Sequence, residues 1–205
     1  MNAQNLQSAL ILQLRETSKL EKRRDYIGIS NISKCPRQAY SDLVHGFNGT
    51  DFAHQMAYAG YLFEQDAIAR LAAMGFVKQD GSLNAEVMCP ANPAIRGHVD
   101  GETNLGDLLE IKSVSKRKFE ILSYQNRPLH EHTDQVQLYM HYGYWKTCLI
   151  IYICRETFEH RVFDVRYDAA KAGELETKML SLAEAVKLKS PPACTCGKCG
   201  SRHHE

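Results

Sequence analysis

Acidic and basic side chains recur between residues 96 and 113 at spacings that suit metal-ion chemistry. Asn104 and Gly106 favour a turn between two strands. A turn centred between them sets Asp100 directly opposite Glu110, with Cβ atoms about 5 Å apart on one face. Two carboxylates held in this way repel each other unless a divalent cation lies between them. Mg²⁺ or Mn²⁺ with oxygen ligands fits this gap.

The residues around the two acids decide what else faces such an ion. Alternate side chains of a strand share one face, so Lys112 projects beside Glu110 while Ile111 projects to the other side. A lysine next to a metal ion orients attacking water or stabilises charge that develops on a phosphoryl group. His98 shares the face of Asp100 and is expected to support it from behind. The alternative, a solvent-exposed hairpin with ordinary charges, suits opposed acids poorly because like charges across a ladder destabilise it.

This pattern resembles the signature of the PD-(D/E)XK nucleases, here as Asp100 followed by Glu110-Ile111-Lys112. The flanking GHVDG and LLEIKS are similar to the RecB-like branch, which includes the CRISPR-associated iron–sulfur exonucleases of the fourth Cas family and phage homologues. The resemblance implies a restriction-endonuclease-like α/β fold, in which helices flank a mixed central sheet. It also implies hydrolysis of DNA with Mg²⁺ or Mn²⁺ held by the two acids and the Ile111 carbonyl.

Two further elements of this family have counterparts in the sequence. Glu64, four residues after Gly60, matches an acid from an earlier helix, where RecB-like nucleases often carry histidine and the phage exonuclease branch carries glutamate. A partly buried acid requires a partner such as a metal ion, and the alternative is a surface glutamate. Gln135 and Tyr139 match a Q-x3-Y element and share one face of a predicted helix. The resemblance implies that they line the site and hold DNA or Lys112.

The seven cysteines suggest core thiols or metal ligands, since we expect an intracellular chain without disulfides. Three lie close together at Cys194, Cys196 and Cys199, one short of a closed four-ligand site. The family's iron–sulfur members place one cysteine before the nuclease core, and Cys35 is similar to it. The resemblance therefore implies a [4Fe–4S] cluster. The alternatives are a tail without metal and a Zn²⁺ site whose fourth ligand is one of three residues: Cys35, His203 or His204.

A net charge of +1 excludes a uniformly basic DNA-coating protein. DNA would instead contact local basic patches, with metal ions offsetting the phosphate charge. The run Lys116, Arg117 and Lys118 follows the predicted catalytic strand and is expected to bind DNA, although a solvated helix start is an equal alternative. Further basic candidates lie nearer the N-terminus: Lys22, Arg23, Arg24, Lys34 and Arg37.

Hydrophobic periodicity predicts the elements that position these residues. Helices are expected over 3–23, from Ser30 or Ser33 to Gly46, and over 52–75, 116–124, 131–144 and 168–188. Strands are expected over 86–89, 95–101, 107–113, 147–154 and 159–166. The run TCLIIYIC at 147–154 indicates a strand that is buried on both faces. Three segments follow: helical residues 1–50 with one cluster cysteine, a nuclease core at 51–168, and a helix with a cysteine-rich tail at 169–205.

The most specific function that these features favour is an exonuclease acting on single-stranded or frayed DNA, in phage recombination, repair or CRISPR spacer processing. Protein partners would then belong to a recombination or CRISPR adaptation complex. One alternative is a catalytically silent nuclease-like scaffold with an iron–sulfur or zinc site that binds DNA or a protein. A second is a zinc-stabilised interaction protein with incidental acids. No apolar run approaches about 20 residues, and no basic region precedes the N-terminal apolar stretch, so we expect a cytoplasmic protein without a membrane span.

Overall fold

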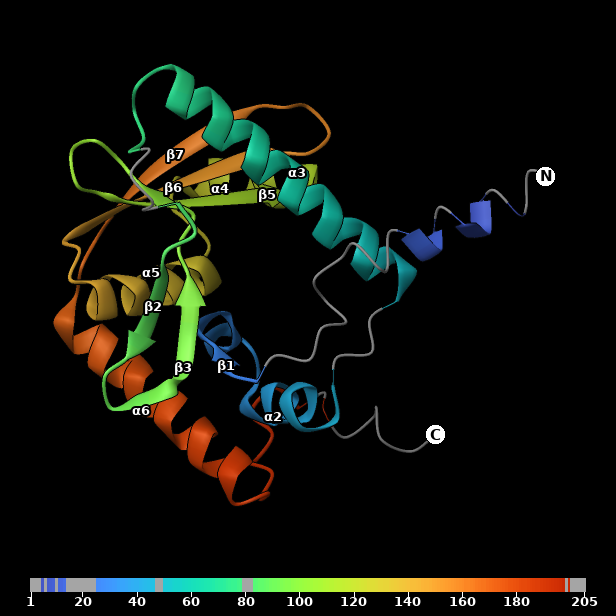
Figure 1. Cartoon of the computed structure of the whole chain (residues 1–205), viewed down its shortest axis with the longest axis vertical. Helices are drawn as coiled ribbons and strands as arrows, with labels where there is room; N and C mark the ends of the chain where they lie inside the picture. The colour runs from blue at the N-terminus through green and yellow to red at the C-terminus, as the bar shows by residue number, and fades with distance from the viewer. Residues whose placement is uncertain are drawn as a thin grey trace.

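The computed structural model describes residues 5, 7–9, 11–13, 25–46, 50–78, 83–197 and 199. These residues form a three-stranded sheet in the order β1-β3-β2 and a four-stranded sheet in the order β4-β5-β6-β7. Helices cover both faces of the larger sheet (Figure 1). The mixed α/β fold predicted from the sequence is confirmed. Four features lie wholly or mostly outside the described residues: the helix predicted over 3–23, the basic residues 22–24, His203 and His204.

The larger sheet consists of β4 (Gly101–Glu102), β5 (Leu108–Val114), β6 (Thr147–Cys154) and β7 (His160–Arg166). The β4–β5 and β6–β7 pairs are antiparallel hairpins, whereas β5 and β6 run parallel. A parallel pair requires a long crossover, and two helices fill the connection between β5 and β6. As a result, the chain leaves β5 and β6 at the same edge of the sheet.

The smaller sheet joins the beginning of the described chain to its middle. β1 (Ile27–Gly28) pairs parallel with β3 (Asn92–His98), and β2 (Glu86–Cys89) pairs antiparallel with β3. A short 3-10 helix, η1 (Ile29–Ser33), follows β1, and α2 (Pro36–His45) comes next. The segment 1–50, predicted as helical, therefore also contributes a short strand to a sheet.

The N-terminal boundary of α2 differs from the prediction. Ser30 and Ser33, the predicted caps, lie within η1, and Cys35 is the N-cap residue instead. Pro36 occupies the first helical position, where its missing N–H costs nothing. The helix ends before Gly46 as predicted, with a φ of +84° at this glycine.

The remaining helices are α3 (Asp51–Ala73), α4 (Lys116–Gln125), α5 (His130–Gly143) and α6 (Ala169–Lys187). α3 packs on one face of the larger sheet, while α4 and α5 contact β6. α5 also packs on α6 and η1, and α2 packs on α6, which joins the two ends of the described chain (Figure 1). No helix among the described residues is long and apolar enough to cross a membrane.

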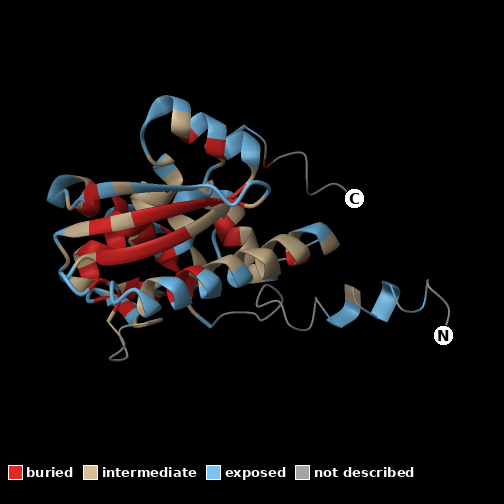
Figure 2. Cartoon of the chain, turned by 90° about the horizontal axis from the view of Figure 1, so that it is seen from above, coloured by how far each residue is buried: buried red, intermediate tan, exposed pale blue. Residues whose placement is uncertain are grey.

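Two apolar clusters lie on opposite faces of the larger sheet. β5 and β6 send alternate side chains into each, as the buried central strands in Figure 2 show. Ile111 packs in the cluster beneath α3, whereas Leu108 packs in the cluster on the other side. β6 is therefore buried on both faces, which confirms the prediction from its continuous apolar run.

The apolar stripe of α3 is buried only in part. Ala67 and Ile68 are buried under the helix, but Phe52 at its start is 68% exposed. The N-terminal half of α3 extends past the sheet (Figure 1). Periodicity predicts the helix correctly, but it does not show where the sheet ends beneath it. The half that extends beyond the core is left to line a groove.

Candidate active site

The acidic hairpin has the register predicted from its sequence. Gly101 pairs with Leu109, and Glu102 pairs with Leu108. The turn closes with a hydrogen bond from the N–H of Gly106 to a carbonyl, and φ at this glycine is +89°, a value that side chains disfavour. Pairing stops after Gly101, so the next position in the register places Asp100 beside Glu110.

Asp100 lies against an open stretch of the β5 edge. Because β4 ends at Gly101, no strand among the described residues lies beside the backbone of β5 beyond Leu109 on that edge. The N–H of Ile111 donates to Asp100 Oδ2 at 2.6 Å instead. The N–H and the C=O of one strand residue point to the same edge, so the Ile111 carbonyl faces the side on which Asp100 lies.

Glu110 is the most deeply buried acid of the site, with a side chain only 1% exposed. Its Oε1 accepts a hydrogen bond from Gln135 Nε2 at 3.1 Å and forms an ion pair with Lys112 Nζ. Its Oε2 is buried and has no hydrogen-bond partner among the residues that the structure describes. A buried carboxylate oxygen without a partner is costly, so this atom fits the position of a metal ligand.

The electrostatics of the site also favour a bound cation. Burial and the neighbouring Asp100 raise the pKa of Glu110 to about 8, although Lys112 opposes this shift. Burial likewise raises the pKa of Asp100, again against the pull of Lys112. Burial alone would lower the pKa of Lys112, but the two carboxylates raise it above its ordinary value. Two acids therefore share one lysine, and a divalent ion would restore the balance of charge.

Glu64 of α3 borders the same site. It lines a groove of about 800 Å³ together with Asp100, Ile111 and Lys112. Its charge is close enough to raise the pKa of Glu110 further. The groove therefore brings Glu64 and Asp100 together with the lysine, and Glu110 lines a smaller cavity that Asp100 and Lys112 also line.

Gln135 and Tyr139 of α5 form a support behind the acids. Gln135 Nε2 donates to the Tyr139 hydroxyl at 2.9 Å as well as to Glu110. Both side chains are buried. Tyr139 packs so closely on β3 that a Cβ at Gly97 would lie 2.7 Å from its Cε1. The Q-x3-Y pair thus holds the Glu110 carboxylate in place.

His98 and the basic run lie around this centre rather than in it. His98 lines the groove, and its Nε2 lies 3.9 Å from Glu86 Oε1. Lys116 is the first residue of α4, shortly after β5. Lys118 Nζ forms an ion pair with Glu131 at 3.1 Å, so part of the charge of the run is already matched.

The cysteine cluster brings together both ends of the described chain. The Sγ atoms of Cys35, Cys194, Cys196 and Cys199 all lie within 4.8 Å of one another. Four pairs are 3.3 to 4.0 Å apart. Burial opposes ionisation of Cys35, but hydrogen bonds from Thr195 lower the pKa of its thiol to about 5. Because thiolates are the form that binds metal, the donor set fits a metal centre.

Sequence reasoning missed Arg155, the residue directly after β6. Its NH1 donates to the Ser113 carbonyl at 2.9 Å, and its side chain lines the groove beside Lys112. One sequence signal could have found it. The buried run that ends at Cys154 predicts a strand parallel to β5, and residues following parallel strands meet at one edge.

Comparisons with known proteins show the fold. No protein-family model matches the sequence, and no curated protein is similar to it at the level of sequence. The structure is similar to LHK-Exo, an alkaline exonuclease from Laribacter hongkongensis, in its complex with dAMP. The TM-score is 0.66 at 16% identity, over 83% of this chain and 92% of that chain.

Two other solved structures are similar over comparable lengths. SSO0001 gives a TM-score of 0.59 at 17% identity, over 92% of this chain and 89% of that chain. A phage-related exonuclease from Haemophilus somnus gives 0.57 at 12% identity, over 80% of this chain and 95% of that chain. The chain therefore shares the fold of these structures, two of which are named as exonucleases, in keeping with the PD-(D/E)XK pattern that its acidic hairpin resembles.

Proposed function

We propose that this chain is a metal-dependent nuclease that hydrolyses phosphodiester bonds in DNA. The observation that carries the proposal is the buried Glu110 Oε2, which lacks a hydrogen-bond partner among the described residues, beside a second carboxylate on Asp100. A purely structural hairpin would gain nothing from two buried acids at this spacing. The exonuclease fold of the similar structures supports the same conclusion.

The ion would be held by Asp100, Glu110 and Glu64, with the Ile111 carbonyl as a further oxygen ligand. Oxygen donors of this kind suit Mg²⁺ or Mn²⁺. When bound, such an ion activates water for attack and neutralises charge on the phosphoryl oxygens. Gln135 fixes the Glu110 carboxylate through Oε1, which would leave Oε2 to bind the ion, while Gln135 also donates to the Tyr139 hydroxyl.

Lys112 would act on the reacting phosphate. The two carboxylates keep its ammonium group charged. Its Nζ pairs with Glu110 Oε1 and lines the groove, so it can orient a water molecule or donate to a phosphoryl oxygen. In this role Lys112 stabilises the charge that develops as the bond breaks. His98 would support the acids. The run Lys116, Arg117 and Lys118 would bind the DNA strand near the groove.

The substrate that we propose is single-stranded or frayed DNA with a free end. Asp100 and Lys112 line both the groove and a smaller cavity of about 190 Å³, and a cavity of this size suits the end of a strand better than a continuous duplex. The similar structures that are named as exonucleases support this mode of cutting. We propose that the protein acts in phage recombination, in repair or in CRISPR spacer processing, together with partner proteins of those complexes.

We further propose that Cys35, Cys194, Cys196 and Cys199 hold a structural metal centre. A [4Fe–4S] cluster and a single Zn²⁺ ion both accept four thiolates. Thiolates around one tetrahedral ion lie about 3.8 Å apart, and the observed sulfur separations of 3.3 to 4.0 Å match this spacing. The four thiolates of a [4Fe–4S] cluster bind different iron ions and therefore lie farther apart than those around one ion. A cluster would thus require the cysteine-rich tail to move away from Cys35. Iron, sulfide and zinc analysis of anaerobically purified protein distinguishes the two.

The direct test is digestion of end-labelled single- and double-stranded DNA with Mn²⁺, run beside Lys112→Ala and Asp100→Asn. We expect Mn²⁺-dependent shortening from one end by the wild type and a loss of about a thousandfold or more in each variant. Circular dichroism should show that both variants stay folded. A folded wild type that does not cut, or variants that cut at the wild-type rate, would favour the catalytically silent scaffold.

A further inference from the structure

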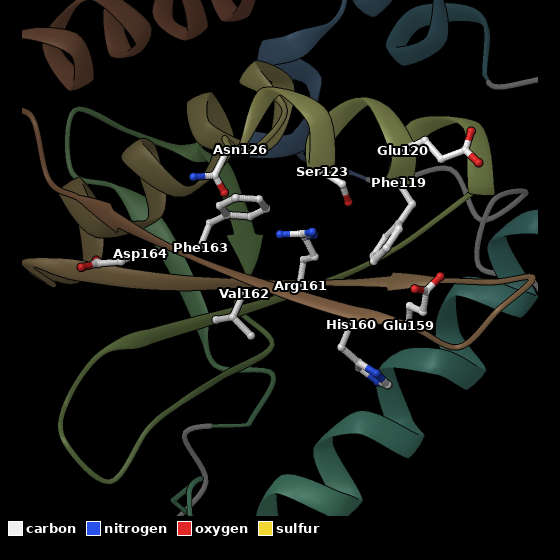
Figure 3. A pocket seen from close by; sticks show the side chains of 10 residues that line it. All are labelled: Phe119, Glu120, Ser123, Asn126, Glu159, His160, Arg161, Val162, Phe163 and Asp164. Atoms are coloured by element: carbon white, nitrogen blue, oxygen red, sulfur yellow. The ribbon is translucent and has the colours of Figure 1, made fainter.

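Two large hollows flank the larger sheet, and they differ in charge. The hollow between α4 and β7, about 850 Å³, is lined by Glu120, Glu159 and Asp164, and Arg161 points from β7 toward α4 (Figure 3). Three carboxylates against one arginine disfavour a phosphate chain there. The groove beside the acids has a different arginine, Arg155.

Arg155 is anchored in a way that leaves its charge available. Its NH1 donates to the Ser113 carbonyl at 2.9 Å, and its backbone N–H donates to the Val114 carbonyl at 3.0 Å. The Ser113 carbonyl is neutral, so it fixes the guanidinium without cancelling its charge, while the backbone hydrogen bond holds the residue at the end of β6. Arg70 and Arg96, by contrast, pair with carboxylates among the described residues.

The hydrogen bond to the Ser113 carbonyl places the Arg155 guanidinium beside β5, one residue after Lys112. Ser113, whose carbonyl holds the guanidinium, directly follows the lysine, and both residues line the same groove. Gly60 of α3 keeps this part of the groove narrow, since a Cβ there would lie 3.7 Å from Ser113 Oγ. A strand whose reacting phosphate contacts Lys112 would therefore carry a neighbouring phosphate past Arg155.

We propose that Arg155 binds the backbone phosphate next to the one that is cut, and so sets the path of a DNA strand along the groove. This inference rests on the proposed nuclease function. A planar guanidinium binds a phosphate through two parallel hydrogen bonds, which fixes orientation as well as adding affinity. Arg155 is thus a substrate-binding residue, whereas Lys112 acts on the reacting phosphate.

The test measures binding without cleavage. In an Asp100→Asn background, a fluorescein-labelled single-stranded oligonucleotide is titrated at several salt concentrations, and anisotropy gives the Kd. Arg155→Gln keeps a donor for the Ser113 carbonyl but removes the charge. We expect it to weaken binding about tenfold and to reduce the slope of log K against log salt by about 0.7. Arg155→Lys keeps the charge and should keep the slope.

The matched control is Arg161→Gln, which removes the same charge from the acidic hollow and should leave both quantities within about twofold of the parent. If Arg155→Gln binds DNA like this control, Arg155 only positions Ser113 and the proposal is wrong. A lower melting temperature in Arg155→Gln together with normal affinity would overturn the proposal in the same way. Because this assay needs no cutting, failure of the wild type to digest DNA would contradict the proposed function separately.

Discussion

The two candidate metal centres of this chain are assembled in opposite ways. The acid–lysine centre takes most of its groups from one short hairpin and buries its central acid, Glu110, whose side chain is only 1% exposed. The cysteine centre joins Cys35 to Cys194, which lies 159 residues away, near the surface. The first depends on strand register and side-chain support. The second depends on the packing of α2 against α6.

This difference implies that the two centres should respond differently to pH. A metal ion binds the deprotonated form of Glu110, whose pKa is raised to about 8. Below that pH, binding must displace a proton, so the affinity for Mn²⁺ should rise about tenfold per pH unit from about pH 6 and level off above about pH 8. Isothermal titration calorimetry with Mn²⁺ measures this dependence.

Glu110→Gln is the control for the pH dependence, because it removes the titrating group and should leave weak binding with little pH dependence. A wild-type affinity that stays flat between about pH 6 and pH 8 would show that Glu110 is already ionised without metal. In the cysteine centre the thiol pKa is lowered to about 5 for Cys35 and to about 7 for Cys194, but neighbouring thiols and burial raise that of Cys199 to about 12, so metal affinity there should still rise with pH above pH 8.

Removal of one thiolate should affect stability more than catalysis. Cys35→Ser opens a tie between segments 159 residues apart, and cross-links over more than 100 residues stabilise by about 4 to 5 kcal/mol in the chain-entropy model. We expect the melting temperature to fall by about 10 °C, while the turnover of folded protein stays within a few fold. Calorimetry and cleavage assays well below the transition measure the two effects.

Cys154→Ala provides the comparison, because this buried cysteine packs in the core and not in the cluster. It should cost some stability but leave the metal content unchanged. If Cys35→Ser abolishes cleavage while the protein stays folded, the cysteine centre is part of the active site and the separation of the two centres is wrong.

The support behind the acids should tolerate little added volume. A Cβ at Gly97 would lie 2.7 Å from Tyr139 Cε1 and 3.3 Å from Ile29 Cβ, so Gly97→Ala should destabilise the fold by about 1 to 3 kcal/mol. Gly173→Ala, where nothing lies within 4 Å in helix α6, should stabilise by about 0.5 to 1 kcal/mol. Urea unfolding measures both, and equal midpoints would show that Tyr139 is free to move aside.

The difference between the two candidate metal centres also explains which features could be predicted from the sequence. The hairpin register follows from a local turn and an alternation of side chains, so the placement of Asp100 beside Glu110 was predictable without coordinates. Hydrophobic periodicity likewise predicted the helices, and the continuous apolar run predicted β6. The convergence of Cys35 with the tail is a long-range contact that no local pattern specifies, and only a resemblance to a family indicated it.

Other features lie beyond local reasoning for the same reason. The two-residue strand β1 is too short to give a periodic pattern, and it exists because β3 offers a free edge. Arg155 looks like an ordinary loop residue until the parallel pairing of β5 and β6 brings it to the groove. The exposure of Phe52 depends on where the sheet ends beneath α3, which the helix sequence does not contain.

The central claim is that one divalent ion joins the two acids of the hairpin. A crystal grown with Mn²⁺ and measured at the manganese absorption edge tests this claim most directly. We predict an anomalous peak about 2.2 Å from Glu110 Oε2, from an Asp100 carboxylate oxygen and from the Ile111 carbonyl. Full occupancy of Mn²⁺ elsewhere, with Asp100 and Glu110 lacking any peak between them, would contradict the account.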